Sequence, residues 1–331
     1  MTTYDVYGIG NALVDKEFEV DDNFFVEAGI EKGFMTLMDE HPQQVILDLL
    51  SQRYPLKKQA GGGSAANTLY AVSQFGGKTF YACKVANDET GDFYVSALGD
   101  HNISTNLGAQ REPGMTGRCL VMVTPDAERT MLTHLGISSQ VSPSDVQEEI
   151  VAQAKFVYIE GYLVTSDSAR AAAKKLKACA EQHGVKTALT FSDPAMVEYF
   201  KDGVNEVLGD GVDLLFCNEQ EAKIWADEDD FEKACKKIAT VATSFVITRG
   251  ARGALLFDGQ NYIDIAPHSV KAVDTNGAGD MFSGAFLYGI TQGMSFQKAG
   301  ELASLASATV VTEFGPRLDP EQHLRLLEKL N

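Results

Sequence analysis

The regular alternation of strand and helix patterns after residue 155 constrains the fold of this 331-residue chain more than any other feature. Apolar, strand-like runs occur at 155–163, 185–194, 212–219 and 244–250, and helical patterns lie between them. Strands that alternate with helices form a mostly parallel sheet with helices on both faces. We therefore expect an α/β fold, a three-layer α/β/α sandwich whose ligands bind beyond the carboxyl ends of the strands.

The first 140 residues follow a less regular pattern. The run YDVYGIG at 4–10 predicts a further strand of the main sheet, whereas the segments at 12–20 and 34–39 resemble half-exposed strands. Residues 117–135 predict a hairpin that turns at Pro125–Asp126. We expect these additional strands, inserted at about 12–40 and 104–136, to form a small lid sheet over the ligand-binding edge of the main sheet.

Composition and charge exclude several classes of partner. The net charge of −18 disfavours binding to nucleic acid or to an acidic membrane surface. No apolar run approaches membrane-spanning length, and the N-terminal residues lack the basic and apolar segments of a signal peptide. The five cysteines are scattered and form no CxxC pair, as in a protein with reduced thiols. We therefore expect a cytoplasmic protein with a small-molecule substrate.

The segment DTNGAGDMFSGAF at 274–286 is the strongest candidate for a chemical site. A predicted strand at 268–273 precedes it and an apolar helix follows. Its small residues therefore lie at a helix N-terminus, where free N–H groups and the helix dipole attract anions. Asp280 at this helix start can accept a proton from a substrate hydroxyl that attacks phosphorus, although the dipole should lower its pKa. The alternative is that Asp280 only caps the helix.

A second glycine-rich junction, AGGGSAANTLYAVSQFGG at 60–77, also leads into a helix. Its glycines allow a ligand to approach the backbone closely. It is not a Walker P-loop, because no GK[ST] follows, and it lacks the GxGxxG spacing of a dinucleotide site. The alternative is a glycine-rich helix start that packs tightly on the sheet.

Two later strand ends carry polar residues. In CNEQEA at 217–222, Asn218 and Glu221 share one face of a helix start, where an amide and a carboxylate beside phosphates suit a hydrated Mg²⁺ ion. A capping box has similar spacing and is favoured when this segment is taken alone. The segment TRGARGALLF at 248–257 suits a phosphate contact and a plain turn equally well.

Taken in order, these segments resemble the ribokinase family, also called the PfkB carbohydrate kinases. The resemblance spans nearly the whole chain and rests on GNALVD at 10–15, GGGSAAN at 61–67, NEQE at 218–221, TRGARGA at 248–254 and DTNGAGD at 274–280. It implies one ribokinase-like catalytic domain over residues 1–331 that transfers the γ-phosphoryl group of ATP. Within the family, four segments are most similar to adenosine kinases, namely GNALVD, TGRC at 116–119, VDLLFCNEQEA at 212–222 and DTNGAGD.

The resemblance also implies roles at the acceptor site. Asp280 would be the base, and Arg129, on the lid hairpin, would reach the transferring phosphate. The anion hole would consist of Gly277, Ala278 and Gly279. The ribose hydroxyls would be held by polar and glycine residues, namely Asn11, Asp15, Gly62, Gly63 and Asn67. The nucleobase would contact Cys119 and Met131, and Asn276 would lie near the substrate or the nucleotide.

Further residues would bind the nucleotide and metal ions, as the same resemblance implies. Asn218 and Glu221 would organise Mg²⁺ and the phosphates through water. ATP would lie along four residues, Thr248, Gly250, Gly253 and Ser304. Three further residues fall where some relatives offer carbonyl groups to a K⁺ ion, and these are Val310, Glu313 and Gly315.

We therefore predict an ATP-dependent kinase that phosphorylates the 5′-hydroxyl of a nucleoside, adenosine first of all. The nearest alternative is a member of the same family that acts on a free sugar or a sugar acid. A non-catalytic nucleoside-binding module of the same fold is a further alternative, but binding alone needs no base such as Asp280. A monomer and a homodimer both stay open, because a lid sheet can close a site or form a dimer interface.

Overall fold

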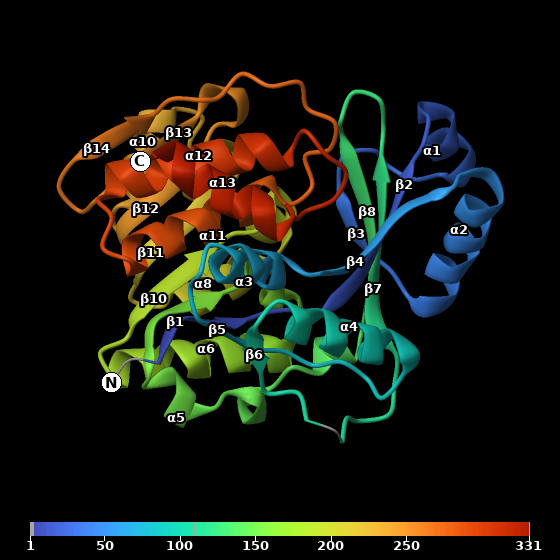
Figure 1. Ribbon diagram of the computed structural model, residues 1–331, viewed down its shortest axis with the longest axis horizontal. Coiled ribbons are helices and arrows are strands. Elements are labelled where there is room, and N and C mark those ends of the chain that lie inside the picture. Colours follow the sequence, from blue (N-terminus) through green and yellow to red (C-terminus); the bar gives the residue numbers. More distant parts are fainter. Residues whose placement is uncertain (1–2, 109, 331) are drawn as a thin grey trace.

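The computed structural model describes residues 3–108 and 110–330 and contains two β-sheets (Figure 1). The larger sheet has nine strands in the order β14-β13-β12-β11-β10-β9-β1-β5-β6. Their bounds are Tyr4–Ile9 (β1), Thr79–Ala82 (β5), Ile103–Thr105 (β6), Ala154–Ile159 (β9), Lys186–Thr190 (β10), Val212–Asn218 (β11), Ala242–Thr248 (β12), Ala254–Phe257 (β13) and Tyr262–Ile265 (β14).

The larger sheet is mostly parallel, as the alternating pattern predicts. All neighbouring pairs from β12 to β6 run parallel, and only β13 and β14 at one edge are antiparallel. Because parallel strands have their carboxyl ends at the same edge, the loops after β1, β9 and β10 meet there. This edge is where the small sheet lies.

Helices cover both faces of the larger sheet and complete the predicted three layers. One hydrophobic core joins the sheet to α3 (Ser64–Gln74), α4 (Glu89–Asp100), α11 (Ala278–Thr291), α12 (Phe296–Val310) and α13 (Pro320–Leu330). A second core lies on the opposite face, against α5 (Glu148–Val151), α6 (Asp167–Gln182), α7 (Pro194–Tyr199), α8 (Lys201–Leu208), α9 (Glu219–Ala226) and α10 (Phe231–Ile238).

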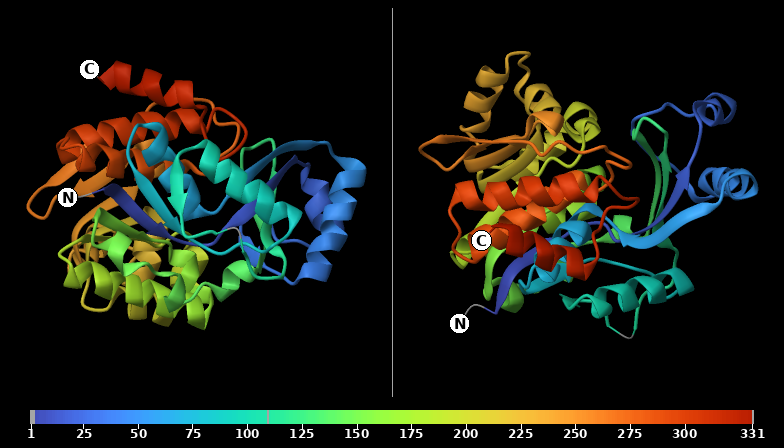
Figure 2. Two further views of the ribbon diagram at one scale, coloured as in Figure 1. Left: turned by 60° about the horizontal axis from the view of Figure 1, so that its bottom comes forward. Right: turned by 45° about the horizontal axis from the view of Figure 1, so that its top comes forward.

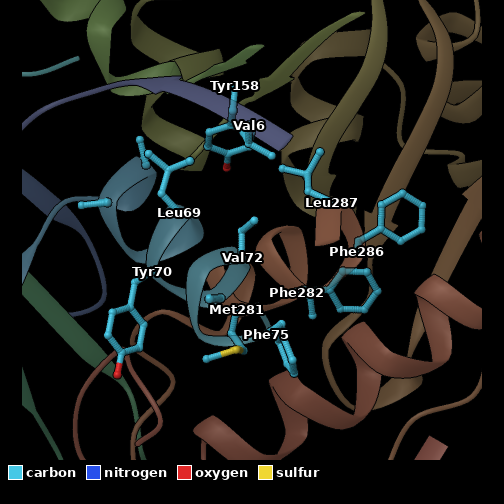
Figure 3. Close-up of a cluster of buried hydrophobic side chains, with 14 of the residues drawn as sticks. Val6, Leu69, Tyr70, Val72, Phe75, Tyr158, Met281, Phe282, Phe286 and Leu287 are labelled. Atoms are coloured by element: carbon cyan, nitrogen blue, oxygen red, sulfur yellow. The ribbon is translucent and has the colours of Figure 1, made fainter. Parts of the chain in front are cut away.

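The contact between α3 and α11 fixes the two helices that carry the candidate site. Figure 3 shows Leu69 and Val72 of α3 near Phe282 of α11 in one buried cluster, with Val6 of the sheet above them. Gly284 of α11 permits this close approach, because a Cβ atom there would lie 2.5 Å from the Thr68 carbonyl oxygen. The N-termini of both helices are therefore held in a fixed relation.

The second, smaller sheet has five strands in the order β3-β8-β7-β2-β4. We call it the small sheet, and its strands are Leu13–Glu19 (β2), Met35–Leu37 (β3), Leu56–Gly62 (β4), Thr116–Val123 (β7) and Arg129–Gly136 (β8). The β7–β8 pair is the predicted hairpin. The helices α1 (Asp22–Ala28) and α2 (Glu40–Arg53) cover the side of the small sheet away from the main body (Figures 1 and 2).

The strands of the small sheet differ from those predicted in two places. Strand β4 belongs to it although it lies outside the predicted segments, and β6 pairs with β5 in the larger sheet. The residues of β4, LKKQAGG, are mainly polar or glycine, so they lack the apolar alternation that marks a strand. The strand forms because β2 supplies an antiparallel partner.

The prediction of a strand at 268–273 was wrong. These residues have no strand assignment, and Val270 is 45% exposed. The two valines of HSVKAV favour an extended conformation, but no described strand lies beside them. The N–H groups of Val273 and Asp274 instead donate to the carbonyl of Val311, after α12, so the segment enters α11 as a loop.

Across the described ranges, no helix combines the length and apolar character that crossing a membrane requires.

Candidate active site

A pocket with about 800 Å³ of empty space, partly open to solvent, lies between the larger sheet and the small sheet. Loops after β1, β9 and β10 contribute Asn11, Glu160 and Ser192. Most residues predicted for the acceptor site also line it, namely Asp15, Gly63, Asn67, Cys119, Arg129, Met131, Asn276, Gly277, Gly279 and Asp280. Gly62 and Ala278 are not among its lining residues.

The first turn of α11 presents free backbone donors to this pocket. Gly277 has φ +72°, a conformation that favours glycine. Among the described residues, no hydrogen-bond acceptor meets the N–H groups of Gly277 or Gly279, whereas the N–H of Ala278 donates to the Thr275 carbonyl at 3.3 Å. Two of the three predicted anion-hole residues therefore keep a free N–H, and that of Ala278 is already in use.

Asp280 is held by two side chains from the start of α3. The Ser64 hydroxyl donates to its Oδ1 at 2.7 Å, and the Asn67 amide donates to its Oδ2 at 3.0 Å. Burial raises the pKa of Asp280, while these two hydrogen bonds and the nearby Arg129 and Arg317 oppose the rise. The expected lowering of this pKa by the helix dipole was wrong, because desolvation of the carboxylate outweighs the stabilising contacts.

Arg129 extends from β8 of the small sheet to the loop before α11. Its NH1 group donates to the Thr275 carbonyl at 3.0 Å, while its Nε is buried without a hydrogen-bond partner among the described residues. Arg129 lies on the β7–β8 hairpin and lines the pocket, while its contact with a transferring phosphate stays a prediction. It brings a positive charge from the small sheet to the N-terminus of α11.

Asp15, on β2, faces the pocket, and its carboxylate accepts no hydrogen bond from the described residues. Burial raises its pKa to about 7, and the charge of Arg317 opposes the rise. Lys32, a lysine in the loop after α1, pairs with Asp22 and Asp126 rather than with Asp15. The carboxylate of Asp15 is thus available to a ligand.

Gly62 lies behind this carboxylate rather than in the pocket wall. A Cβ atom on Gly62 would lie 2.2 Å from the Asp15 carboxyl group, so only glycine lets β4 pass so close to β2 at this point. Gly62 therefore shapes the site through Asp15.

One wall of the pocket is apolar and comes mainly from the small sheet. It consists of Leu13, Met35, Leu37, Cys119, Met131 and Leu135. Cys119 accepts a hydrogen bond from the Thr133 hydroxyl at 3.4 Å, and burial raises the pKa of its thiol. The predicted pair Cys119 and Met131 thus lies in a larger apolar surface, of which sequence analysis had identified only these two members.

Glu160 is a pocket residue that sequence analysis missed. Its Oε1 accepts from the backbone N–H and the side-chain amide of Asn11, both at 3.1 Å, and its Oε2 accepts from the N–H of Ala65 at 2.8 Å. Burial raises its pKa to about 7. Glu160 thereby ties the end of β1 to the start of α3. Its position directly after the β9 strand was the available signal.

Asn276 joins the loop before α11 to the small sheet. Its side-chain amide donates to Oε1 of Glu17, on β2, at 3.3 Å, and its backbone N–H donates to Asp274 at 2.8 Å. The other carboxyl oxygen of Glu17 is buried without a partner in the described chain, and burial raises the pKa of Glu17 to about 8.

Asn218 and Glu221 form a reciprocal capping box at the start of α9. The Asn218 side chain accepts from the Glu221 N–H at 2.8 Å, and Glu221 accepts from the Asn218 N–H at 3.0 Å. Their side chains also meet directly, at 2.7 Å. Burial raises the pKa of Glu221 to about 8. The geometry therefore matches the structural alternative, and the pair lies outside the pocket wall.

The residues predicted to line an ATP site lie at the end of β12 and on α12, also outside this pocket. Thr248 ends β12, and a tight turn follows in which Gly250 and Gly253 have positive φ angles. Ser304 donates its hydroxyl to the Ala266 carbonyl at 2.8 Å. The turn after Thr248 is exposed and lies beside the carboxyl edge of the sheet, whereas Ser304 is buried.

The three residues considered for K⁺ lie in and after the last turn of α12. The carbonyl of Val310 accepts from the N–H of Glu313, and the N–H of Gly315 donates to the buried carboxylate of Asp274 at 2.9 Å. Between them in sequence, the carbonyl of Phe314 accepts from the ammonium group of Lys58 at 3.1 Å. A potassium site here stays a prediction.

Comparison with known proteins identifies the family of this chain. The model of the pfkB family of carbohydrate kinases matches residues 55–323. The chain is 26% identical over 334 residues to the adenosine kinase of Saccharomyces cerevisiae, with 95% of this chain and 96% of that protein covered.

Two solved structures are similar over almost their whole lengths. A probable sugar kinase from Rhizobium etli has a TM-score of 0.92 and 34% identity, with 100% of both chains covered. The adenosine kinase from Sinorhizobium meliloti has a TM-score of 0.91 and 33% identity, with 98% of this chain and 99% of that chain covered. The chain therefore belongs to the pfkB family of carbohydrate kinases, and it is an adenosine kinase-like phosphotransferase with an alcohol group as acceptor.

Proposed function

We propose that this protein transfers the γ-phosphoryl group of ATP to the 5′-hydroxyl of a nucleoside, with adenosine as the preferred acceptor and Asp280 as the base. One observation carries the proposal. Asp280 is fixed by Ser64 and Asn67 beside the free N–H groups of α11, in a pocket that also has an apolar surface from the small sheet.

Asp280 and the start of α11 suit the chemical step. As the acceptor oxygen bonds to the γ-phosphorus and the bond to the leaving ADP oxygen breaks, the acceptor proton passes to the Asp280 carboxylate. The raised pKa of Asp280 makes it a better proton acceptor. The free N–H groups of Gly277 and Gly279 suit the negative charge on the transferring group. Arg129 adds a positive charge from the small sheet.

The polar and the apolar lining residues of the pocket suit the two halves of a nucleoside. The unpartnered carboxylate of Asp15 can accept hydrogen bonds from neighbouring hydroxyls of a ribose, with Asn11 and Gly63 nearby. The apolar wall that contains Cys119 and Met131 suits a flat nucleobase, because burial of apolar surface supplies binding energy. A free sugar would leave this wall uncovered.

The exposed turn after β12 suits the nucleotide. Gly250 is exposed with open space around it, so its backbone is accessible to phosphate, whereas the N–H of Gly253 already donates to the Gly250 carbonyl at 3.0 Å. Thr248 and Ser304 would contact the rest of ATP. A Mg²⁺ ion would lie near Asn218 and Glu221. Both carboxyl oxygens of Glu221 already accept hydrogen bonds, so contact through water suits this pair better than direct ligation. Mg²⁺ would neutralise charge on the ATP phosphates.

A sugar kinase is the second candidate function. The polar lining residues Asp15, Asn11 and Ser192 also suit a polyhydroxylated sugar. A similar protein of known structure is described as a probable sugar kinase. The two candidates share the base and the anion site, and they differ in what covers the apolar wall.

The test is a comparison of acceptors under one set of conditions. ADP formation is measured with ATP and Mg²⁺ for adenosine, guanosine, inosine, ribose and a hexose, and the phosphorylated carbon is identified by ³¹P and ¹H NMR. We expect the highest kcat/KM for adenosine and phosphate on its 5′ carbon. A higher kcat/KM for ribose or the hexose than for every nucleoside would replace the first candidate by the second.

A further inference from the structure

Arg317 reaches the candidate base through one intervening side chain. It lies in the loop after α12, and its Nε donates to Oδ1 of Asn67 at 2.9 Å. The same amide of Asn67 donates through Nδ2 to Oδ2 of Asp280 at 3.0 Å. A continuous chain of hydrogen bonds therefore runs from a guanidinium group to the carboxylate.

The hydrogen-bonding capacity of each group fixes which atoms donate and which accept in this series of hydrogen bonds. A guanidinium group only donates and an ionised carboxylate only accepts, whereas an amide has a donor end and an acceptor end. If the Asn67 amide were turned over, its NH₂ would face the N–H of Arg317 and its oxygen would face Asp280. Both contacts would be lost. Arg317 therefore fixes the orientation in which Asn67 donates to Asp280.

The surrounding loop holds Arg317 firmly. Its guanidinium carbon lies 4.8 Å from the ring centroid of Tyr70, and the Tyr70 hydroxyl donates to the carbonyl of Leu318 at 2.8 Å. Two residues earlier, Gly315 donates to Asp274. This placement leaves one donor unsatisfied, because NH2 of Arg317 is buried without a hydrogen-bond partner in the described ranges.

Arg317 also acts on the charge of the site. Burial raises the pKa of both Asp280 and Asp15, and Arg317 opposes the rise at each. Other titratable or charged groups also interact with Asp280 from the elements around it, namely Arg129 on β8, Asp15 on β2, Tyr158 on β9, and Glu160 and Tyr162 after β9. Arg129 and Arg317 are the cations of this set.

We propose that Arg317 is a positioning residue of the phosphoryl-transfer site, which orients the Asn67 amide toward Asp280 and favours the ionised form of that carboxylate. The assignment of Asp280 as the base rests on the function proposed above. The orientation of Asn67 by Arg317 is a property of the free protein, so it can be tested without substrate.

The test uses Arg317→Met, which keeps an apolar stem over Tyr70 but removes the charge and the donors. Arg118→Met is the matched control. Arg118 is also half-buried and also donates its Nε to an amide oxygen at 2.9 Å, that of Gln43, but it does not line the pocket. Arg317→Lys keeps a donating cation.

The first readout is the titration of Asp280 in the substrate-free protein, followed by NMR with ¹³C-carboxyl-labelled aspartate and assigned with Asp280→Asn. Loss of the Arg317 charge raises the pKa of Asp280, and a turned Asn67 amide would remove a hydrogen bond that also opposes the rise. We expect this rise in Arg317→Met, a smaller one in Arg317→Lys, and none in Arg118→Met. An unchanged Asp280 midpoint in Arg317→Met would overturn the proposal.

The second readout is the pH profile of kcat, measured with the best acceptor of the wild type. A one-unit shift lowers kcat about tenfold below both midpoints, and the loss disappears at higher pH. A loss of equal size at every pH, shared by Arg317→Lys, would indicate a packing role only. Arg317→Gln, neutral and still a donor, replaces Arg317→Met in both readouts if the latter does not fold. Failure of the nucleoside assignment would appear in the wild-type acceptor comparison and leave the NMR result intact.

Discussion

A Cβ atom placed on Gly277 would lie 2.4 Å from the Cβ of Pro316, so the loop after α12 packs directly against the first turn of α11. Gly277 also has φ +72°. The two constraints together require glycine at this position of the candidate anion site, and they connect that site to the loop that carries Arg317.

Gly277→Ala should therefore lower both stability and activity. Alanine at a positive φ costs more than about 1 kcal/mol, and the clash with Pro316 adds to that cost. Gly279→Ala is the matched control, because outside its own stretch of helix no atom of the described residues lies within 4 Å of a Cβ atom there. It should keep or raise the Tm while lowering kcat, since its methyl group enters the phosphate region. Thermal unfolding and steady-state kinetics measure both. Equal Tm values for Gly277→Ala and the wild type would contradict the packing argument.

Glu17 predicts an unusual pH dependence of stability. Burial raises its pKa in the folded protein to about 8, so between about pH 4.5 and 8 the folded state binds a proton that the unfolded state has lost. The contribution of Glu17 to the free energy of unfolding is therefore largest at low pH and falls as the pH rises toward 8. Glu17→Gln keeps the acceptor for Asn276 and removes this loss. It should be more stable than the wild type at pH 8.5, by about 1.4 kcal/mol for each unit of pKa shift.

The control for this prediction is Glu19→Gln, two residues further along β2, where the carboxylate pairs with Lys57 at the surface. Urea unfolding at pH 5.5, 7 and 8.5 compares the three proteins. Parallel curves for Glu17→Gln and the wild type would show that Glu17 is ionised in the folded protein at neutral pH.

Asp15 should determine the preference for a ribose with both hydroxyls. A buried polar group left without its partner costs about 1–3 kcal/mol, so 2′-deoxyadenosine should have a kcat/KM roughly 5- to 150-fold below that of adenosine. Asp15→Ala should remove most of this preference, and Asp22→Ala, which changes an exposed carboxylate near the same sheet, should retain it. An undiminished preference in Asp15→Ala would exclude contact between Asp15 and the ribose.

Glu221→Gln separates the two interpretations of the Asn218–Glu221 pair. If the pair organises Mg²⁺, the variant should need a several-fold higher Mg²⁺ concentration for half-maximal activity, because it loses a negative charge near the ion. If the pair is only a capping box, the variant should lose stability, and its Mg²⁺ titration should coincide with that of the wild type. Activity against Mg²⁺ concentration, with Tm measured in parallel, distinguishes the two.

The residues that sequence analysis identified share one property, which is that the local chain already reveals their environment. The small residues before Asp280 mark a helix start, and Asp15 and Asn67 lie in glycine-rich segments at predicted strand or helix ends. The alternating runs that ended at these points predicted the parallel sheet and the β7–β8 hairpin for the same reason.

The features that sequence analysis missed depend on contacts between distant parts of the chain. Arg317 meets Asn67 across 250 positions, and nothing in the sequence around Arg317 marks it as part of a site. Strand β4 forms because β2 supplies a partner, and 268–273 stays a loop because none of the described strands lies beside it. The pKa of Asp280 was predicted in the wrong direction because burial by the small sheet and α3 is a tertiary property.

The most direct test of the proposed function is the turnover of Asp280→Asn with the best acceptor. The variant keeps the size of the side chain and loses the ability to accept a proton. Loss of a general base lowers rate by roughly 10²–10⁴-fold. We predict a fall of this size in kcat and a KM for the acceptor within a few-fold of the wild-type value. The Tm of the variant should lie within a few degrees of the wild-type Tm. A kcat equal to that of the wild type would contradict the account and leave Asp280 as a residue of the first turn of α11 without a part in catalysis.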